Sequence, residues 1–316
     1  MKKIYAILLT SLFFLGSASA QQTNVSMLFV GDLMLDELPG QAIKKGKNPL
    51  AAFKAQFASA DLRFGNLECV VGSGGTREIK PFTFQAHPRV LNTVKQHFSA
   101  VSLANNHSGD FGPEAFGRML DLLDKKAIRY FGGGHNVRAA HAPFVTEVKG
   151  LRIAVLAYDD FFPRSFEALE DRPGVAWADD DQVAFDIRAA KTTHRADIVI
   201  VYPHWGWEHE KMASPRQIQL AHLMIDAGAD AVVGGHPHVT QNIEMYKNKP
   251  IFYSLGNFVF NGFHTEDSQT GWALEMVLSA DKKLDWKIHV AKLDKNGIPV
   301  YAGILPQAEV EKVLSR

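Results

Sequence analysis

Two histidines, His236 and His238, follow a short apolar run and two consecutive glycines in residues 232–238. Glycine lets the backbone turn sharply and approach an ion closely, and neutral imidazole is the commonest protein ligand for transition metals. A lone histidine at such a place is usually an ordinary surface or core residue. A pair of them after a strand-like run predicts a turn that binds a metal ion.

Four other apolar, β-rich runs end in residues that can bind a metal or move a proton. Ligand sites in open α/β sheets gather at the carboxyl ends of strands, so we expect the five ends to share one pocket lined by oxygen and nitrogen atoms. No single end would support this, because many strands finish in polar turns. The four runs are residues 25–32, ending in Asp32, 62–68, ending in Glu68, 100–107, ending in Asn106 and His107, and 198–204, ending in His204.

Taken in chain order, these motifs resemble the calcineurin-like metallophosphoesterase superfamily. Within it they are most similar to the bacterial capsule-synthesis family of CapA type, which is associated with poly-γ-glutamate capsules. The similarity spans about residues 25–260. The motifs that carry it are Gly31-Asp32-Leu33-Met34-Leu35, Asn66-Leu67-Glu68, Ala104-Asn105-Asn106-His107 with Asp110, Pro203-His204-Trp205-Gly206, Gly235-His236-Pro237-His238 and the stretch from Tyr253 to Phe260.

The resemblance implies a four-layer α/β/β/α sandwich with one or two divalent metal ions bound at the strand ends. Mixed oxygen and nitrogen ligands suit Mn²⁺, Zn²⁺ or Fe better than Ca²⁺, whose ligands are oxygens. The implied ligands are Asp32 and His238 for the first ion, Asn106, His204 and His236 for the second, and Glu68 as the bridge between them.

The same resemblance places His107 beside the ions without binding them, and Asp110 behind it as the residue that orients its ring. Two cations about 3.5–4 Å apart would lower the pKa of a shared water and so supply a nucleophile at neutral pH. A protonated His107 would then stabilise negative charge or protonate a leaving group. For a phosphate ester we expect an in-line displacement.

Two positions depart from the superfamily's pattern. Its first motif is usually D-x-H, whereas this chain has Met34 at the histidine position, and Asn66-Leu67-Glu68 stands where an aspartate is usual. The first ion therefore loses an imidazole, which argues against generic phosphatase activity unless Asp36 or Glu37 replaces that ligand. The CapA branch shares the altered pattern, so we interpret it as a feature of the branch.

The chain has 316 residues, 46% hydrophobic and 22% charged, as in ordinary globular proteins. Basic and acidic residues number 34 each, so no nucleic-acid partner is expected, although Lys44, Lys45 and Lys47 form a local basic patch. Cys69 is the only cysteine. It cannot form an intramolecular disulfide, and its apolar neighbours predict a buried, inert thiol.

Residues 1–20 have the pattern of a secretory signal peptide, with two lysines, an apolar run over 4–15 and small residues up to Ala20. Cleavage near Ala20 would give a periplasmic or extracellular protein. An uncleaved membrane anchor is the alternative, for which the apolar run is short. We expect residues 21–316 to form a single domain.

Strand and helix patterns alternate to about residue 254, and strands follow. This order predicts one layered α/β domain. For the acidic pair Asp159 and Asp160, after the strand at 151–157, two positions stay open, one facing the pocket and one on the surface, and we favour the interpretation as surface charge. Helices are expected at 48–60, 113–126, 179–194 and 215–227, and strands at 127–131, 144–148, 151–157, 251–254, 257–260, 271–279 and 284–292.

These patterns favour an exported, metal-dependent hydrolase or transferase in the synthesis of a capsule or envelope polymer. Its substrate would be a phosphate ester, or an amide or acyl link in an anionic polymer of the polyglutamate type. A membrane-bound capsule polymerase complex is the expected partner. Two alternatives stay open: a non-catalytic polymer-binding or assembly subunit that keeps the fold, and an exported phosphodiesterase or nucleotidase.

Overall fold

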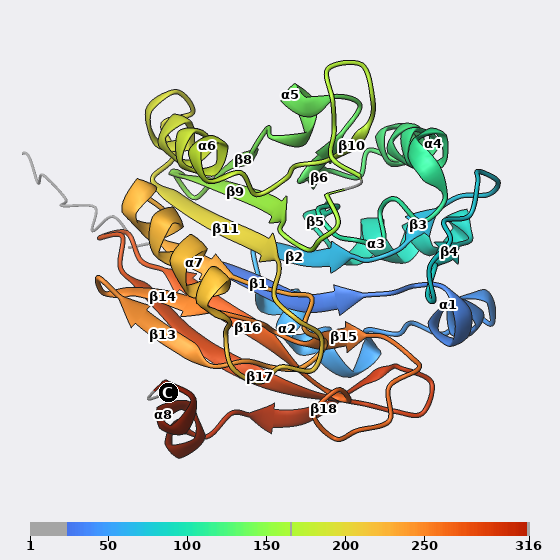
Figure 1. Ribbon diagram of the computed structural model, residues 1–316. Coiled ribbons are helices and arrows are strands. Elements are labelled where there is room, and N and C mark those ends of the chain that lie inside the picture. The colour runs from blue at the N-terminus through green and yellow to red at the C-terminus, as the bar shows by residue number, and fades with distance from the viewer. Residues whose placement is uncertain (1–23, 165, 315–316) are drawn as a thin grey trace, which may run out of the picture.

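The computed structural model describes residues 24–164 and 166–314. In them two β-sheets lie face to face, and helices cover both outer faces (Figure 1). This is the α/β/β/α sandwich, which confirms the predicted fold class. No helix in these two ranges is long and apolar enough to cross a membrane. The predicted signal peptide, residues 1–20, lies outside the described residues.

The first sheet runs in the order β18-β17-β16-β1-β2-β5-β6, with β15 also beside β1. Strands β1, β2, β5 and β6 are parallel, so their carboxyl ends lie at one edge of the sheet. The antiparallel tail β16–β18 extends the other side. The strands are β1 (Val25–Leu33), β2 (Leu62–Leu67), β5 (Ala100–Ser102), β6 (Tyr130–Phe131), β15 (Asn257–Val259), β16 (Thr270–Leu278), β17 (Leu284–Leu293) and β18 (Pro299–Ile304).

The second sheet runs in the order β13-β14-β12-β11-β9-β8. Its four central strands are parallel and its two edge strands antiparallel. Its strands are β8 (Phe144–Val148), β9 (Leu151–Asp159), β11 (Ile198–His204), β12 (Ala231–Val233), β13 (Ile243–Tyr246) and β14 (Lys249–Phe252). Two short pairs lie outside it, β3 (Val70–Val71) with β4 (Gln85–Ala86) and β7 (Gly133–Gly134) with β10 (Gly174–Val175).

The helices form because apolar residues recur at helical spacing on the face that each buries. In α4, Phe116, Met119 and Leu123 are buried against the first sheet. Helix α7 begins with a capping box between Ser214 and Gln217. The first sheet is covered by α1 (Glu37–Lys44), α2 (Lys54–Ser59), α3 (Leu91–His97) and α4 (Gly112–Lys125), and the second by α5 (Val137–Ala140), α6 (Asp180–Thr192) and α7 (Pro215–Ala227), while α8 (Gln307–Leu314) packs near β13.

Aromatic side chains hold the two sheets together. The rings of Phe29 and Phe64 stack with centroids 4.8 Å apart, and Tyr202 of β11 packs edge-on against Phe29. The Tyr202 hydroxyl also donates to the backbone carbonyl of Val30 in β1. This bond links the two sheets two residues before Asp32 and His204, which carry part of the candidate site.

Most predicted elements are present, with differences at their bounds. The helix expected at 48–60 is a 3-10 turn, η1 (Ala51–Phe53), followed by the short helix α2. The strand expected at 127–131 is only β6, while the helix expected at 215–227 coincides with α7. Helices α1 and α3 were not predicted, because their short amphipathic patterns lie inside loop-like sequence.

Candidate metal centre

Side chains from distant strand ends meet at one end of the sandwich. Two groups in the described residues have ligand atoms that all lie within 4.8 Å of one another. Both groups contain Glu68, which is fully buried. The first group is Asp32, Glu68 and His238, and the second is Glu68, His204 and His236.

In the first group, His238 lies between the two carboxylates. Its Nδ1 is 3.6 Å from Oδ2 of Asp32 and its Nε2 is 3.8 Å from Oε1 of Glu68. The amide nitrogen of Asn257 donates to the carbonyl oxygens of His238 and Ser268, which leaves its Oδ1 to accept from Nδ1 of His238 at 2.9 Å. This arrangement puts the ring proton on Nδ1 and leaves the Nε2 lone pair free for a metal ion.

In the second group, two imidazoles and an amide converge. Nε2 of His204 lies 3.8 Å from Oε1 of Glu68 and 3.1 Å from Nδ1 of His236. Oδ1 of Asn106 is 2.9 Å from the same Nε2 of His204. The structure therefore brings together all six predicted ligands, and their roles as ligands stay predictions.

The local backbone around the histidine pair is constrained. His236 and His238 have φ angles of 96° and 57°, in the left-handed region that residues with side chains adopt rarely. A Cβ atom at Gly235 would lie 2.9 Å from Oδ1 of Asp32, so only glycine allows this approach without displacing the carboxylate. Such backbone strain is concentrated at functional sites.

The donor set fits a divalent cation. Burial raises the pKa of Asp32, and burial together with Asp32 raises the pKa of Glu68 well above its ordinary value. Burial lowers the pKa of His204 and His236, and it lowers that of His238 to about 4. A bound cation would offset the cost of burying the ionised carboxylates, and it would bind the imidazoles in their neutral form.

Two buried atoms in the cluster support the same conclusion. Oε1 of Glu68 and Nε2 of His236 have no hydrogen-bond partner within the described ranges. Buried polar atoms are nearly always paired in folded proteins, and an unpaired one needs an explanation. Here both belong to the candidate groups, and a shared metal ion would satisfy both.

An amide that sequence reasoning overlooked holds the carboxylates in place. Nδ2 of Asn66 donates to Oδ1 of Asp32 at 2.9 Å and lies 3.3 Å from Oε2 of Glu68. Its Oδ1 accepts from Nδ2 of Asn105 at 2.9 Å. Asn66 and Asn105 lie in the motifs that end in Glu68 and His107. The position of Asn66 at a buried strand end, two residues before Glu68, was the signal that could have predicted its role.

Beside the cluster, His107 and Asp110 form the predicted pair. Nδ1 of His107 is 2.8 Å from Oδ2 of Asp110, and the other carboxylate oxygen is 2.5 Å from Nζ of Lys80. Lys80 also donates to the backbone carbonyl of Asn106 at 2.8 Å. Lys80 was not predicted, because it lies in a loop without strand or helix periodicity.

The chain matches a known protein family over most of its length. The profile of the family described as "Bacterial capsule synthesis protein PGA_cap" matches residues 26–262. The chain belongs to the PGA_cap family. The profile spans β1 to the loop after β15, so it includes every residue of both candidate metal groups.

Two relatives support this assignment, and one solved structure shares the fold. "Capsule biosynthesis protein CapA" of Bacillus anthracis is 32% identical over 254 residues, which are 76% of this chain and 61% of that protein. "PGA biosynthesis protein CapA" of Bacillus subtilis (strain 168) is 35% identical over 245 residues, 75% and 63% of the two. The match thus spans about three fifths of these relatives. Haemophilus influenzae NAD nucleotidase shares the fold, with a TM-score of 0.51, 14% identity and coverage of 93% of this chain and 62% of that one.

In this PGA_cap chain, Met34 is part of the hydrophobic core. Its side chain is fully buried in the core under the first sheet, and its sulfur accepts a bond from the backbone nitrogen of Asp36 at 3.3 Å. The Asp36 carboxylate accepts from the nitrogen of Gln85, and Glu37 accepts from Asn261. Neither Asp36 nor Glu37 belongs to a candidate group in the described residues, so no replacement ligand comes from them.

The acidic pair Asp159 and Asp160 and the single cysteine, Cys69, are all buried. The interpretation of Asp159 and Asp160 as surface charge is wrong, since they are only 4% and 8% exposed. Asp159 is the last residue of β9, in register with His204 of β11, and burial raises its pKa to about 8. Asp160 follows it and pairs with Arg216 at 3.1 Å. Cys69 is buried as predicted, and burial raises its thiol pKa, so it is inert.

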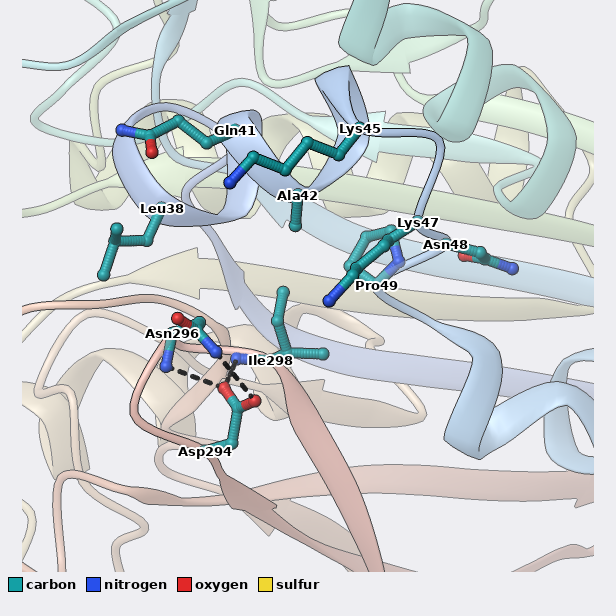
Figure 2. A pocket seen from close by; sticks show the side chains of 10 residues that line it. All are labelled: Leu38, Gln41, Ala42, Lys45, Lys47, Asn48, Pro49, Asp294, Asn296 and Ile298. Atoms are coloured by element: carbon teal, nitrogen blue, oxygen red, sulfur yellow. Dashed lines mark hydrogen bonds between the residues drawn. The ribbon is translucent and has the colours of Figure 1, made fainter.

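Two lysines of the basic patch, Lys45 and Lys47, line a separate hollow of about 260 Å³ between α1 and the turn before β18. Figure 2 shows Lys45 and Lys47 reaching over this hollow from the end of α1. Its acidic residue, Asp294, accepts bonds from the backbone nitrogens of Asn296 and Ile298 at 2.8 and 2.9 Å. Asp294 is thus committed to its own turn, and the two lysines of this PGA_cap member are available to an anion.

Proposed function

We propose that the chain is an exported, metal-dependent hydrolase or transferase that acts in the synthesis of a capsule or envelope polymer. The observation that carries this proposal is the pair of candidate metal groups that share Glu68, next to the His107–Asp110 pair. The family assignment supports the polymer context. The whole protein's substrate and partners are part of the proposal.

Asp32 and His238 would hold one ion, Asn106, His204 and His236 the other, and Glu68 both. Divalent ions bound there would polarise a phosphoryl or carbonyl oxygen and lower the pKa of water. The identity of the metal is proposed as Mn, Zn or Fe, because the ligands combine oxygen with nitrogen.

The His107 side chain would move the proton. Asp110 accepts from Nδ1 of His107 and so fixes the tautomer, which leaves Nε2 for the pocket that His107 lines. Lys80 neutralises the far oxygen of Asp110. His107 is therefore placed to give a proton to a leaving group or to stabilise developing charge.

The test compares metal content and turnover in the same preparations. We expect wild type to retain divalent metal and to hydrolyse bis(4-nitrophenyl) phosphate, or a γ-glutamyl amide in the same panel. Asp32→Ala and His236→Ala should lose both properties. His194→Ala, at an exposed histidine, is the matched control. Equal activity in all four proteins would remove this site from the mechanism.

A non-catalytic role in polymer binding or assembly is the second candidate, and the burial of Met34 at an expected ligand position favours it. His107→Ala combined with His204→Ala separates the two. A folded, correctly localised double variant that still supports capsule formation would identify an assembly subunit. Loss of the capsule with the fold retained supports catalysis.

We propose that the chain binds an anionic polymer of the polyglutamate type and that it acts with a membrane-bound polymerase complex. The available amines of Lys45 and Lys47 support polymer contact at the hollow of Figure 2. Binding of poly-γ-glutamate should weaken with salt and with Lys45→Glu plus Lys47→Glu, but not with Lys95→Glu plus Lys125→Glu, which alter exposed lysines on α3 and α4.

Export is supported by the sequence of residues 1–20. A processed protein outside the cytoplasm is the expected result of cell fractionation. Substitution of Ala18 and Ala20 by bulky residues should leave the precursor uncleaved. Cleavage that is unaffected by these changes would place the processing site elsewhere.

A further inference from the structure

A second pocket, of about 300 Å³, opens beside the first metal group. His107 and His238 form part of its wall, so any molecule bound there is next to the proposed reaction centre. Its remaining wall is mostly aromatic. We call it the aromatic pocket, and its phenylalanines are Phe82, Phe84, Phe260 and Phe263.

The inner wall of the aromatic pocket is built from rings in mutual contact. The centroid of Phe84 lies 4.6 Å from that of His107, and Phe260 lies 4.9 Å from His238. Phe84 and Phe260 meet edge to face at 5.6 Å, and both are buried. Phe82 is 67% exposed and forms the outer wall. The inner part is therefore preformed and the outer part is open to a ligand.

The ionisable residues that line the aromatic pocket are two glutamates and three histidines, His107, His209 and His238. Glu37 and Glu208 line it and are exposed, whereas no lysine or arginine is among its lining residues in the described ranges. Oε2 of Glu37 accepts from Nδ2 of Asn261 at 2.6 Å, which holds that carboxylate at the rim. His238, as a metal ligand, would be neutral. An anionic group would thus meet two carboxylates, and no lysine or arginine of the pocket wall would pair with it.

Aromatic faces and carboxylates together attract organic cations. A ring face attracts an ammonium through its quadrupole, and cages of several rings are the usual sites for ammonium ligands. A nearby carboxylate adds Coulomb attraction that water and salt only partly screen. The apolar ring surface in turn favours a hydrophobic body.

We propose that the aromatic pocket binds the part of the substrate that flanks the reacting bond, and that it selects a hydrophobic group bearing an ammonium over one bearing an anion. This rests on the proposed function, because it assumes that the reaction takes place at the neighbouring metal centre. The carboxylates of an anionic polymer then lie outside this pocket. The linkage that is cleaved or transferred joins the polymer, or a phosphate, to an amine-bearing unit.

Binding of three small probes to the full, metal-loaded chain tests the selectivity without catalysis. The probes are benzylammonium, benzyl alcohol and phenylmethanesulfonate, which share one ring and differ in charge. Sulfonates are weak ligands for divalent ions, so the third probe reports on the pocket. We expect benzylammonium to bind about tenfold more tightly than the sulfonate, with the alcohol between them, when affinity is measured by ligand-observed NMR.

Variants locate the binding. Glu37→Gln plus Glu208→Gln should reduce the preference for benzylammonium over the sulfonate to about threefold or less, while the alcohol's affinity stays the same. Phe82→Ala, at an exposed ring, should weaken all three probes. Glu210→Gln is the matched control, because Glu210 is an exposed carboxylate in the same loop and does not line the pocket.

Two results would overturn the proposal: equal or tighter binding of the sulfonate, or a preference for the ammonium that survives the double Glu→Gln change. Failure of the proposed function has a different signature. In that case no ester or amide in the panel is hydrolysed in a metal-dependent manner, whereas the three probes still report whether the pocket selects a cation.

Discussion

Oδ1 of Asn257 lies 2.9 Å from Nδ1 of His238. The sheet sets this contact, because β15 pairs with β1 in a register that places Asn257 beside Asp32. A residue from the late part of the chain is thereby attached to the strand that carries the first metal group. The hydrogen bond fixes both the tautomer and the angle of the imidazole.

Replacing Asn257 by alanine should therefore weaken metal binding without removing a ligand. Partners that orient a ligating histidine typically contribute 10- to 100-fold to metal affinity. We expect Asn257→Ala to lose metal to a competing chelator at about 10- to 100-fold lower chelator concentration than wild type. Asn92→Ala, at an exposed asparagine, should behave as wild type. Unchanged retention in Asn257→Ala would show that this contact does not orient a ligand.

Glu68→Gln should reduce bound metal more than any other single change in the cluster. Glu68 belongs to both candidate groups, whereas Asp32 and His236 belong to one each. Metal analysis of Glu68→Gln, Asp32→Asn and His236→Gln, with circular dichroism to verify the fold, checks this order. A Glu68→Gln protein with as much metal as Asp32→Asn would contradict a bridging role.

Introducing the histidine of the D-x-H pattern, Met34→His, should not add a ligand. Met34 is fully buried in the core below the first sheet. An imidazole without a partner there costs about 1–3 kcal/mol. We therefore expect lower stability to urea and no gain in metal retention, with Met34→Leu as the volume-matched control. A Met34→His protein that binds more metal would show that the side chain can reach the first group.

Tyr202→Phe tests the link between the sheets. The change keeps the ring against Phe29 but removes the hydroxyl that donates to the Val30 carbonyl. Loss of a buried hydrogen bond should lower the free energy of unfolding by about 1–3 kcal/mol. Denaturant melts measure this difference. A neutral effect would mean that the carbonyl is satisfied by its other neighbours.

Asp61 gives a pH-dependent contribution to stability. Burial pushes the pKa of its carboxyl up, but bonds from Lys149 and Ser26 outweigh this, so the pKa lies below its ordinary value. Because the folded pKa is the lower one, the stabilisation is present above the unfolded pKa of about 3.9 and is lost as the pH falls through the folded value. Asp61→Asn should be less stable than wild type at neutral pH.

The difference between Asp61→Asn and wild type should shrink below about pH 4. Thermal melts across this range provide the measurement, and Asp171→Asn, at an exposed aspartate, is the control. A stability difference that is constant with pH would exclude a contribution from this carboxylate's ionisation.

The strand ends could be predicted from the sequence because each combines two strong local signals. An apolar run followed by a polar residue places Asp32, Glu68 and His204 at carboxyl ends, and parallel pairing brings those ends together. The family resemblance then predicted that two sheets pack face to face, which cannot be inferred from the periodicity of apolar residues alone.

Loops and burial were harder to predict. Asp159 and Asp160 look like surface charge, yet one is enclosed at the end of β9 and the other is compensated by Arg216, which is distant in sequence. Lys80 and Asn66 act mainly through contacts with residues far along the chain, such as Asp110 and Asn106 for Lys80 and Asp32 and Asn105 for Asn66. Such contacts depend on the tertiary fold, and no local spacing encodes them.

The segment that carries Phe82 is attached to the residue behind the proposed proton donor. The backbone nitrogens of Glu78 and Phe84 donate to the carbonyl oxygen and carboxylate of Asp110, at 2.8 and 2.6 Å, and Lys80 pairs with the same carboxylate. One wall of the cavity is thus bonded directly to the proposed acid–base pair of His107 and Asp110. A molecule too bulky for the cavity would push this wall outward and pull His107 away from the bond it should protonate, so size discrimination and turnover would be enforced by the same displacement.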